Sequence, residues 1–258
     1  MKIDGALAVV TGASGGIGEA TARALALAGA EVVLLARDKV RLASVRAAIQ
    51  ADGRKSHIYA VDLSDPQATT RAGQNILLDH GVPDILVNNA GAGRWLKITE
   101  TSSQEASQMI ALPYLAAFNL TRELLDDMRK QARGHIVNVT SVASRLAWPG
   151  AVGYIAARRA MEGFNAALRA DLYGSKIGVT LAVFGTVESS YWDHNPGSRE
   201  RLPKRAASIR SLTPSAAATA LVSSIEKGQR LLVKPAIFRL LFLLNEFLPN
   251  QTEAMMCR

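Results

Sequence analysis

The residues best suited to chemistry begin with a glycine-rich turn at residues 11–18, which reads TGASGGIG. The turn follows an apolar run typical of a buried strand and precedes an alanine-rich segment typical of a helix. Glycines let the backbone approach a pyrophosphate, and the start of the helix offers unpaired N–H groups. A flexible turn without a ligand is the alternative, which the strand–turn–helix setting disfavours. The predicted phosphate-binding residues are Gly12, Ser14, Gly15, Gly16, Ile17 and Gly18.

The end of the second apolar run is where a protein of this pattern contacts the adenosine ribose. An acidic residue there suits a free 2′-hydroxyl, whereas an arginine suits a 2′-phosphate. Ala36 ends the run and Arg37 follows at once. Because a planar guanidinium matches phosphate, NADP(H) is favoured over NAD(H). In the alternative, Arg37 is a surface residue and Asp38 binds the ribose.

Further motifs follow in a fixed order along the chain. They are Asp62-Leu63, Asn88-Asn89-Ala90-Gly91, and Ser141 and Tyr154 thirteen residues apart. Together with the glycine-rich turn, they resemble the short-chain dehydrogenase/reductase family over about residues 7–233. The resemblance implies hydride transfer between a nicotinamide and a ketone or alcohol. It also implies further cofactor-binding residues, namely Asp62, Leu63, Asn89, Ala90, Gly91, Tyr154, Arg158, Gly185 and Val187.

The resemblance also implies catalytic roles. Tyr154 would exchange a proton with the substrate oxygen, and Ser141 would hold that oxygen. A free tyrosine titrates near pH ~10, so a neighbouring cation is needed to stabilise its phenolate. A serine at a strand end can donate to a developing oxyanion. The alternatives are that Ser141 caps a helix and that Tyr154 is an ordinary amphipathic-helix residue.

Two positions depart from the family pattern. Arg158 stands four residues after Tyr154, where the family has lysine. Arginine keeps the charge and can bind ribose hydroxyls, but it is bulkier and cannot pass on a proton. Pro113 stands where the family has an asparagine that supports a proton relay. Proline distorts a helix, so the sequence predicts that the bend survives and the polar relay is lost.

Seven short apolar runs alternate with helix-period segments, which indicates βαβ crossovers and a parallel sheet. We therefore expect one α/β domain over residues 1–258, a Rossmann-type doubly wound sheet of about seven strands with helices on both faces. Ligands of such a sheet bind at the carboxyl ends of the strands. The expected strands are Leu7–Val10, Glu31–Leu35, Ser56–Val61, Ile85–Val87, His135–Val139, Val179–Phe184 and Leu231–Val233.

Two segments are expected to cover the site or contact partners. Residues 186–212 form an irregular excursion that contains a basic run, either a clamp for an anionic substrate or a solvated loop. Residues 236–248 form an apolar helix that could lie in a subunit interface, over the pocket or against a membrane surface. The basic run is Arg199, Arg201, Lys204, Arg205 and Arg210.

Composition limits the remaining possibilities. The 258 residues carry 48% hydrophobic side chains, which suits one folded domain, and a net charge of +8, which permits an anionic partner. The single cysteine excludes a disulfide framework and a cysteine-based metal site within one chain. No two of the four histidines stand at metal-ligand spacing, so no metal site is expected. Neither a signal peptide nor a span of about 20 apolar residues is evident, so a cytoplasmic location is expected.

The hypothesis is an NADP(H)-dependent reductase or dehydrogenase that forms a homodimer or homotetramer. Its substrate would be a hydrophobic carbonyl compound or alcohol, with aromatic residues lining the pocket or, equally, scattered over the surface. The alternative is an NADP(H)-binding sensor or scaffold without turnover, suggested by the two altered positions. Nucleic-acid binding lacks any base-reading motif. The candidate lining residues are Trp95, Leu146, Trp148, Tyr191 and Trp192.

Overall fold

Seven parallel strands form one sheet in the computed structural model, which describes residues 1–204 and 208–257. Their order across the sheet is β3-β2-β1-β4-β5-β6-β7, so the direction of winding reverses between β1 and β4. This confirms the doubly wound sheet, and every strand lies within two residues of its predicted bounds. The strands are β1 (Leu7–Thr11), β2 (Glu31–Ala36), β3 (Ser56–Ala60), β4 (Ile85–Asn88), β5 (Gly134–Ser141), β6 (Ile177–Phe184) and β7 (Leu231–Lys234).

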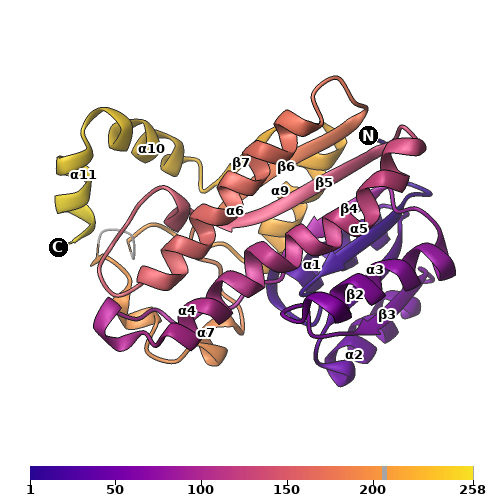
Figure 1. The fold of residues 1–258 in the computed structure, drawn as a ribbon, viewed down its shortest axis with the longest axis horizontal. Helices are drawn as coiled ribbons and strands as arrows, with labels where there is room; N and C mark the ends of the chain where they lie inside the picture. Colours follow the sequence, from indigo (N-terminus) through magenta and orange to yellow (C-terminus); the bar gives the residue numbers. More distant parts are fainter. Residues whose placement is uncertain (205–207, 258) are drawn as a thin grey trace.

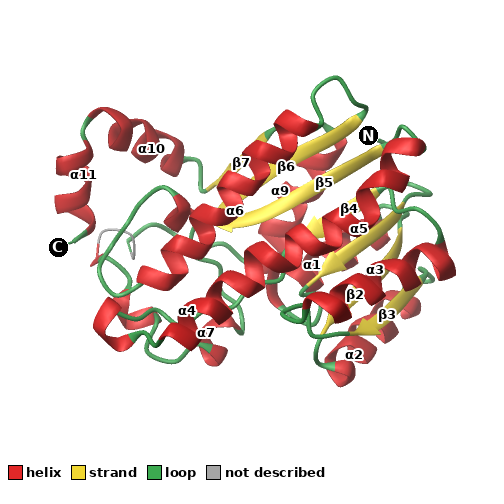
Figure 2. Cartoon of the chain, in the orientation of Figure 1, coloured by secondary structure: helices red, strands yellow, loops and turns green. Residues whose placement is uncertain are grey.

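Helices cover both faces of the sheet (Figure 2). One face packs on α1, α2 and α9, and the other on α3, α5 and α6. The bounds are α1 (Gly16–Leu27), α2 (Lys39–Ala51), α3 (Pro66–His80), α4 (Ser103–Ile110), α5 (Ala116–Lys130), α6 (Val152–Asp171), α7 (Tyr191–His194), α9 (Pro214–Glu226), α10 (Ile237–Phe247) and α11 (Pro249–Met256). Short 3₁₀ turns are η1 (Ile98–Glu100), η3 (Val142–Ser144) and η4 (Arg199–Arg201), and η2 (Ala111–Leu115) is a π-helix.

Alternation along the strands builds the two halves of the core. In β1, Val10 points to the face covered by α1, and Val9 to the face covered by α3 and α5. Both valines are fully buried, as expected for a parallel sheet with helices on both sides. The core thus fixes the carboxyl ends of the central strands, where the crevice of a doubly wound sheet lies.

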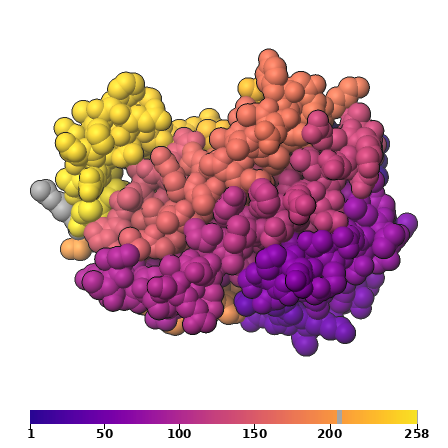
Figure 3. Space-filling model, in the orientation of Figure 1, coloured from indigo at the N-terminus to yellow at the C-terminus, as the bar shows by residue number. Residues whose placement is uncertain are grey.

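The last two helices extend from the carboxyl end of β7 (Figure 1). In the space-filling view, they form a separate lobe with a hollow between it and the body of the molecule (Figure 3). A groove between α10 and β7 lies at this junction and includes Val233 and Phe242. Within the described residues, no helix has the length and apolar character needed to cross a membrane.

Candidate active site

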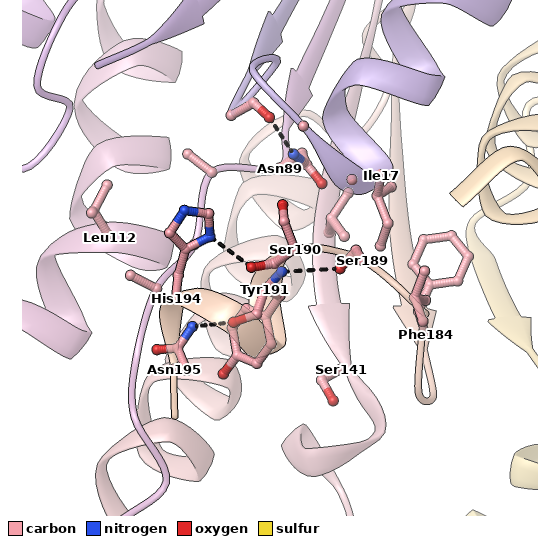
Figure 4. Close-up of a pocket in the computed structure, with 18 of the residues that line it drawn as sticks. Ile17, Asn89, Leu112, Ser141, Phe184, Ser189, Ser190, Tyr191, His194 and Asn195 are labelled. Atoms are coloured by element: carbon pink, nitrogen blue, oxygen red, sulfur yellow. Dashed lines mark hydrogen bonds between the residues drawn. The ribbon is translucent and has the colours of Figure 1, made fainter. Parts of the chain in front are cut away.

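A cavity of about 640 Å³ opens at the carboxyl ends of the strands. Figure 4 shows Ile17 and Asn89 toward one end and Ser141 toward the other, with Tyr191 between them. Of all the predicted site residues, only Gly18 does not line this cavity. The predicted residues that do line it are Gly12, Ser14, Gly15, Gly16, Ile17, Arg37, Asp62, Leu63, Asn89, Ala90, Gly91, Ser141, Tyr154, Arg158, Gly185 and Val187.

The glycine-rich turn has the geometry that a phosphate-binding turn requires. Gly12 and Gly16 have φ values of 67° and 57°, in the left-handed region that side chains rarely adopt. A Cβ on Gly18 would lie 2.1 Å from the Gly12 carbonyl oxygen, so this glycine lets α1 pack closely against the end of β1. Gly18 therefore shapes the turn from behind the cavity.

Asn89 holds this turn against the neighbouring strand. Its side-chain amide donates to the carbonyl oxygen of Thr11 at 2.9 Å, and its backbone N–H donates to Oγ1 of Thr11 at 2.9 Å. The N–H of Ala90 donates to the same hydroxyl, also at 2.9 Å. Asn89 thus fixes the turn with its amide group.

Basic side chains stand at the adenosine end. Arg37 is exposed at the cavity wall, and Arg41 lines the same wall from the first turn of α2. The carboxylate of Asp38 caps α2 by accepting from the N–H of Arg41 at 3.0 Å, and it also pairs with the Arg41 guanidinium at 3.5 Å. Asp38 lines this wall together with the two arginines, and its carboxylate is engaged with α2 and with Arg41. Arg41 was not predicted, although its spacing of four residues from Arg37 is visible in the sequence.

Asp62 lies next along this wall. Hydrogen bonds from Ser64 lower the pKa of the Asp62 carboxyl, and the positive charge of Arg37 lowers it further. The Ser64 hydroxyl donates to Oδ1 of Asp62 at 2.7 Å. Asp62 is therefore an anion in the folded protein at neutral pH and can accept hydrogen bonds from an amino group.

Tyr154 and Arg158 lie one turn apart on α6 and face the cavity together. Each is only 7% exposed, and the Arg158 guanidinium carbon lies 5.0 Å from the centre of the Tyr154 ring. Nε of Arg158 has no hydrogen-bond partner, and no ion pair holds this guanidinium within the described part of the chain. A buried cation without a carboxylate is costly. Its position on the cavity wall therefore suits a polar ligand.

Gly91 makes room for the guanidinium. A Cβ at this position would lie 2.5 Å from Nη2 of Arg158, closer than non-bonded atoms approach. Gly91 follows β4 in the predicted Asn-Asn-Ala-Gly motif. The larger side chain at position 158 thus packs against a residue that has no side chain.

Ser141 ends β5 and faces the cavity from the other side. Its Oγ accepts a hydrogen bond from the N–H of Ala143 at 3.2 Å, which caps η3. The hydroxyl proton of Ser141 is left to donate elsewhere. The preceding Thr140 donates to the carbonyl oxygen of Arg158 at 3.0 Å and so ties β5 to α6.

Pro113 is buried within the π-helix η2, where Leu112 has the non-helical angles φ −107° and ψ 30°. This distortion agrees with the expected bend between α4 and α5. Leu112 lines the cavity beside it. An apolar side chain thus stands on this part of the wall.

Aromatic rings form another part of the cavity wall. The Trp95 ring lies 5.1 Å from Trp148, 5.4 Å from Tyr154 and 5.6 Å from Trp192, centre to centre. The Tyr191 hydroxyl donates to the carbonyl oxygen of Gly93 at 2.7 Å and accepts from Nε1 of Trp95 at 3.1 Å. Burial raises the pKa of Tyr191, and the nearby Tyr154 raises it further. Tyr191 therefore stays neutral, and its hydroxyl links Trp95 to the backbone of Gly93 within this wall.

Four of the five candidate aromatic and aliphatic lining residues do line the cavity. They are Trp95, Trp148, Tyr191 and Trp192. Leu146 lies outside the lining but is buried in the same hydrophobic cluster, with 1% of its surface exposed. The reading of these residues as scattered surface aromatics is therefore wrong.

The excursion at residues 186–212 leaves and rejoins the domain at one point, a bridge between Val187 and Leu212. Its basic residues do not line the cavity: Arg199 pairs with Glu188 at 2.9 Å, and Arg201 pairs with Glu100. Arg205 lies outside the described residues. A clamp for an anionic substrate is thus not formed by the described basic residues. The excursion instead supplies the unpredicted lining residues Ser189, Ser190, His194, Asn195 and Leu202.

The C-terminal helices also reach the cavity. Phe238 of α10 and Met256 of α11 line it, and both are buried. One side of the apolar helix therefore covers the pocket, which was one of the three expected roles. Its other side remains exposed, with Leu240 at 52% and Phe247 at 75%. Sequence alone could not orient this helix because its residues are apolar on nearly every side.

Comparisons with known proteins agree with this arrangement. The sequence profile of the short chain dehydrogenases matches residues 6–198. "Probable oxidoreductase EphD" of Mycobacterium bovis is 32% identical over 233 residues, which are 86% of this chain and 39% of that protein. "Fatty acyl-CoA reductase" of Acinetobacter baylyi is 33% identical over 181 residues, 69% of this chain and 61% of that protein. The chain thus spans well under half of the first relative's length.

Solved structures share the fold. A short-chain dehydrogenase/reductase from Burkholderia phymatum in complex with NAD superposes with a TM-score of 0.89, covering 98% of this chain and 97% of the other at 23% identity. A metagenomic short-chain oxidoreductase in complex with NADP has a TM-score of 0.75 and 31% identity, covering 90% and 96%. The profile match, the relatives and the cavity together establish that this chain belongs to the short-chain dehydrogenase/reductase family of oxidoreductases.

Proposed function

We propose that this protein uses NADP(H) to interconvert a hydrophobic ketone and the corresponding secondary alcohol, with Tyr154 as the general acid and base. The observation that carries the proposal is the buried Tyr154–Arg158 pair on the cavity wall, with a guanidinium that has no carboxylate partner among the described residues. Such a cation beside a phenol suits a site where negative charge develops on oxygen. NAD- and NADP-bound structures both occur among the structural neighbours, so the choice of NADP(H) rests on the residues of this chain.

The residues fit an NADP(H) molecule along the whole cavity. The glycine-rich turn and the start of α1 suit the pyrophosphate, and Arg37 and Arg41 suit the 2′-phosphate. Asp62 suits the adenine amino group. The guanidinium of Arg158, which stands on the cavity wall, suits a ribose hydroxyl. When bound, the nicotinamide supplies or accepts the hydride.

The chain's own groups handle the proton. During reduction, Ser141 donates a hydrogen bond to the substrate carbonyl oxygen, and Tyr154 gives that oxygen its hydroxyl proton. Arg158 keeps a positive charge beside the phenol as it becomes negative. In the reverse direction, Tyr154 takes the alcohol proton. The rings of Trp95, Trp148 and Trp192 exclude water from this step and favour an apolar substrate.

The test is turnover of NADPH over a panel of hydrophobic ketones, with Tyr154→Phe as the key variant. We expect kcat to fall by about 10²- to 10⁴-fold, since Phe cannot exchange a proton, while NADPH affinity changes little. Tyr173→Phe is the matched control because Tyr173 is 92% exposed in the turn that follows α6. Equal turnover by wild type and Tyr154→Phe would contradict the proposed role.

A second candidate is an NADP(H)-binding protein without turnover, for which Pro113 and Arg158 at two functional positions of the family pattern are the argument. This second candidate would be favoured if the protein bound NADPH tightly, did not oxidise NADPH with any ketone and did not reduce NADP⁺ with any alcohol. The fully built aromatic wall around Tyr154 favours the enzyme, because a sensor has no use for a substrate pocket.

A further inference from the structure

Three potential metal ligands meet at the edge of the sheet opposite the cavity. Glu31, His57 and His80 each offer one oxygen or nitrogen atom, and these atoms all lie within 4.8 Å of one another. The residues are 26 and 23 positions apart in sequence, so no spacing motif connects them. We expected no histidine-built metal site because no two histidines stand at metal-ligand spacing in the sequence. Spacing cannot reveal that residues from three separate elements lie together in the fold.

The topology explains why they meet. Glu31 and Val33 share one face of β2, and the register pairs Val33 with His57 of β3, so Glu31 and His57 point to the same face. Val33 packs with residues of α3, so this is the face that α3 covers. A crossover helix returns to the edge where the strands begin, and α3 ends there at His80 (Figure 1). Three separate elements thus bring one ligand each.

The contacts among the three side chains are close. Nε2 of His57 lies 2.8 Å from Oε1 of Glu31, and the rings of His57 and His80 lie 4.1 Å apart, centre to centre. All three residues are partly buried, which limits their freedom but leaves one side open to solvent. The contacts thus bring one carboxylate oxygen and two imidazole rings together at a partly exposed position.

Other charged groups face the cluster from neighbouring elements. Lys55 lies with its Nζ 3.9 Å from Oε2 of Glu31 and competes with a cation for that carboxylate. Asp79 accepts a hydrogen bond from the Tyr59 hydroxyl at 2.6 Å, and the Tyr59 ring stands edge-on to His80. One cation and one further carboxylate therefore surround the cluster, and they offset each other.

We propose that Glu31, His57 and His80 bind a divalent transition metal ion, with Zn²⁺ as the best match. Two imidazole nitrogens and one carboxylate oxygen are a ligand set for Zn²⁺, whereas Ca²⁺ and Mg²⁺ prefer oxygen ligands throughout. On binding, ligand bonds of about 2.0–2.2 Å would replace the present hydrogen bond between His57 and Glu31. Water would complete a tetrahedral site on the open side.

The bound ion would join the edge strand β3, the first residue of β2 and the end of α3. It lies at the amino-terminal edge of the sheet, whereas the cavity lies at the carboxyl ends, so it takes no part in hydride transfer. An ion that binds only the folded state stabilises it by mass action. The expected role is therefore to stabilise this edge of the domain, independently of the proposed oxidoreductase function.

The direct test is titration of metal-free, untagged protein with ZnCl₂ by calorimetry, and with CoCl₂ by visible absorption. We expect one Zn²⁺ per chain, a higher Tm with Zn²⁺, and the intense absorption of four-coordinate Co²⁺. Binding should weaken at acidic pH, because protonated imidazole cannot bind a metal. The proposal would be overturned if no saturable Zn²⁺ binding were found up to a Zn²⁺ concentration of about 100 µM.

His80→Gln and His57→Gln should each weaken Zn²⁺ binding at least about 10-fold and abolish the Co²⁺ absorption. His194→Gln is the matched control, because His194 is an exposed histidine on α7 outside the cluster. Lys55→Gln should bind Zn²⁺ at least as tightly as wild type, since it removes the competing cation. Far-UV circular dichroism of each variant reports whether it is folded, since His194 lines the cavity and NADPH binding would not be a neutral readout. Wild-type Zn²⁺ affinity in folded His80→Gln, or loss of binding in His194→Gln alone, would overturn the site.

Discussion

Arg158 and Gly91 determine how a larger cation fits beside Tyr154. The guanidinium lies so close to Gly91 that a Cβ there would approach Nη2 to 2.5 Å. Neither the backbone of Arg158 nor that of Gly91 is in the left-handed region, so space rather than strain makes glycine necessary at position 91. The pairing explains how this chain can tolerate arginine where the family pattern has lysine.

Gly91→Ala should therefore displace the guanidinium and lower kcat/KM by about 10- to 100-fold, because catalytic groups must be held to within about 1 Å. Steady-state kinetics with NADPH would measure this loss. Gly163→Ala is the control: a Cβ there meets nothing within 4 Å, and alanine in this helix should stabilise the fold by roughly 0.5–1 kcal/mol. Equal activity of both variants would show that the contact with Gly91 is not needed.

We propose that coenzyme choice depends on two arginines, Arg37 and Arg41, rather than on one. Arg37→Ala and Arg41→Ala should each weaken NADPH binding about 10- to 100-fold, since each removes a charge-assisted hydrogen bond worth about 1.5–3 kcal/mol. NADH, which has no 2′-phosphate, should bind with little change. Arg46→Ala is the matched control on the same helix, outside the cavity lining. Fluorescence titration would decide, and an unchanged preference for NADPH in both variants would refute this account.

Sequence predicted the single residues of the site well where motifs carry them and poorly elsewhere. Asp62, Ser141, Tyr154 and the predicted residues of the glycine-rich turn lie in contiguous or fixed-spacing motifs, and all of them except Gly18 line the cavity. Ser189 lies beside Gly16, where a Cβ on the glycine would meet it at 3.3 Å, and this contact depends on the return of a loop some 170 positions further along the chain. Contacts between distant loops depend on tertiary packing, which local patterns do not encode.

At the scale of elements, strand bounds were predictable because strands buried on both faces read as continuous apolar runs. The sequence did not predict which side of α10 is buried, because a helix that is apolar on nearly every side has no polar face to indicate the side exposed to solvent. The structure buries Phe238 and Phe242 and leaves Leu240 exposed. The bend at Pro113 was predictable because proline lacks the N–H that a regular helix needs.

β5 and β6 are joined by a buried polar contact that should make stability depend on pH. His135 is buried, and Thr180 donates its only hydroxyl proton to the carbonyl oxygen of Gln229, so Nε2 of His135 must donate to Thr180, at 2.7 Å. Burial lowers the pKa of His135 to about 4 from its ordinary 6.5. The folded state thus holds the neutral imidazole.

As pH falls from about 6.5 to 4, His135 becomes protonated in the unfolded chain but stays largely neutral in the folded chain. Stability is therefore retained above pH 6.5 and lost below it, by about 3 kcal/mol at pH 4. Urea unfolding at several pH values would measure this slope, which His135→Gln should largely remove. If the stability of His135→Gln changed with pH as steeply as that of wild type, other groups would be responsible for the acid sensitivity.

For the whole molecule, the two edges of the sheet separate two tasks. The carboxyl ends carry the cavity, the excursion and the C-terminal helices, whereas the amino-terminal edge carries the cluster of Glu31, His57 and His80. Chemistry at the first edge therefore does not depend on an ion at the second. The cytoplasmic location and the homo-oligomeric state expected from the sequence remain predictions.

The outer side of α10 is where we expect a second copy of the chain to pack. Six large apolar side chains are exposed on or beside this helix, from Leu244 at 37% to Phe247 at 75%, which is unusual for a surface that faces only water. Light scattering should find wild type as a dimer or tetramer and the double variant Leu240→Glu/Phe247→Glu as a monomer, because the carboxylates cannot be buried without partners. Leu78→Glu is the control, since Leu78 is 83% exposed on α3, and it should leave the mass unchanged. A monomeric wild type would show that α10 serves the pocket alone.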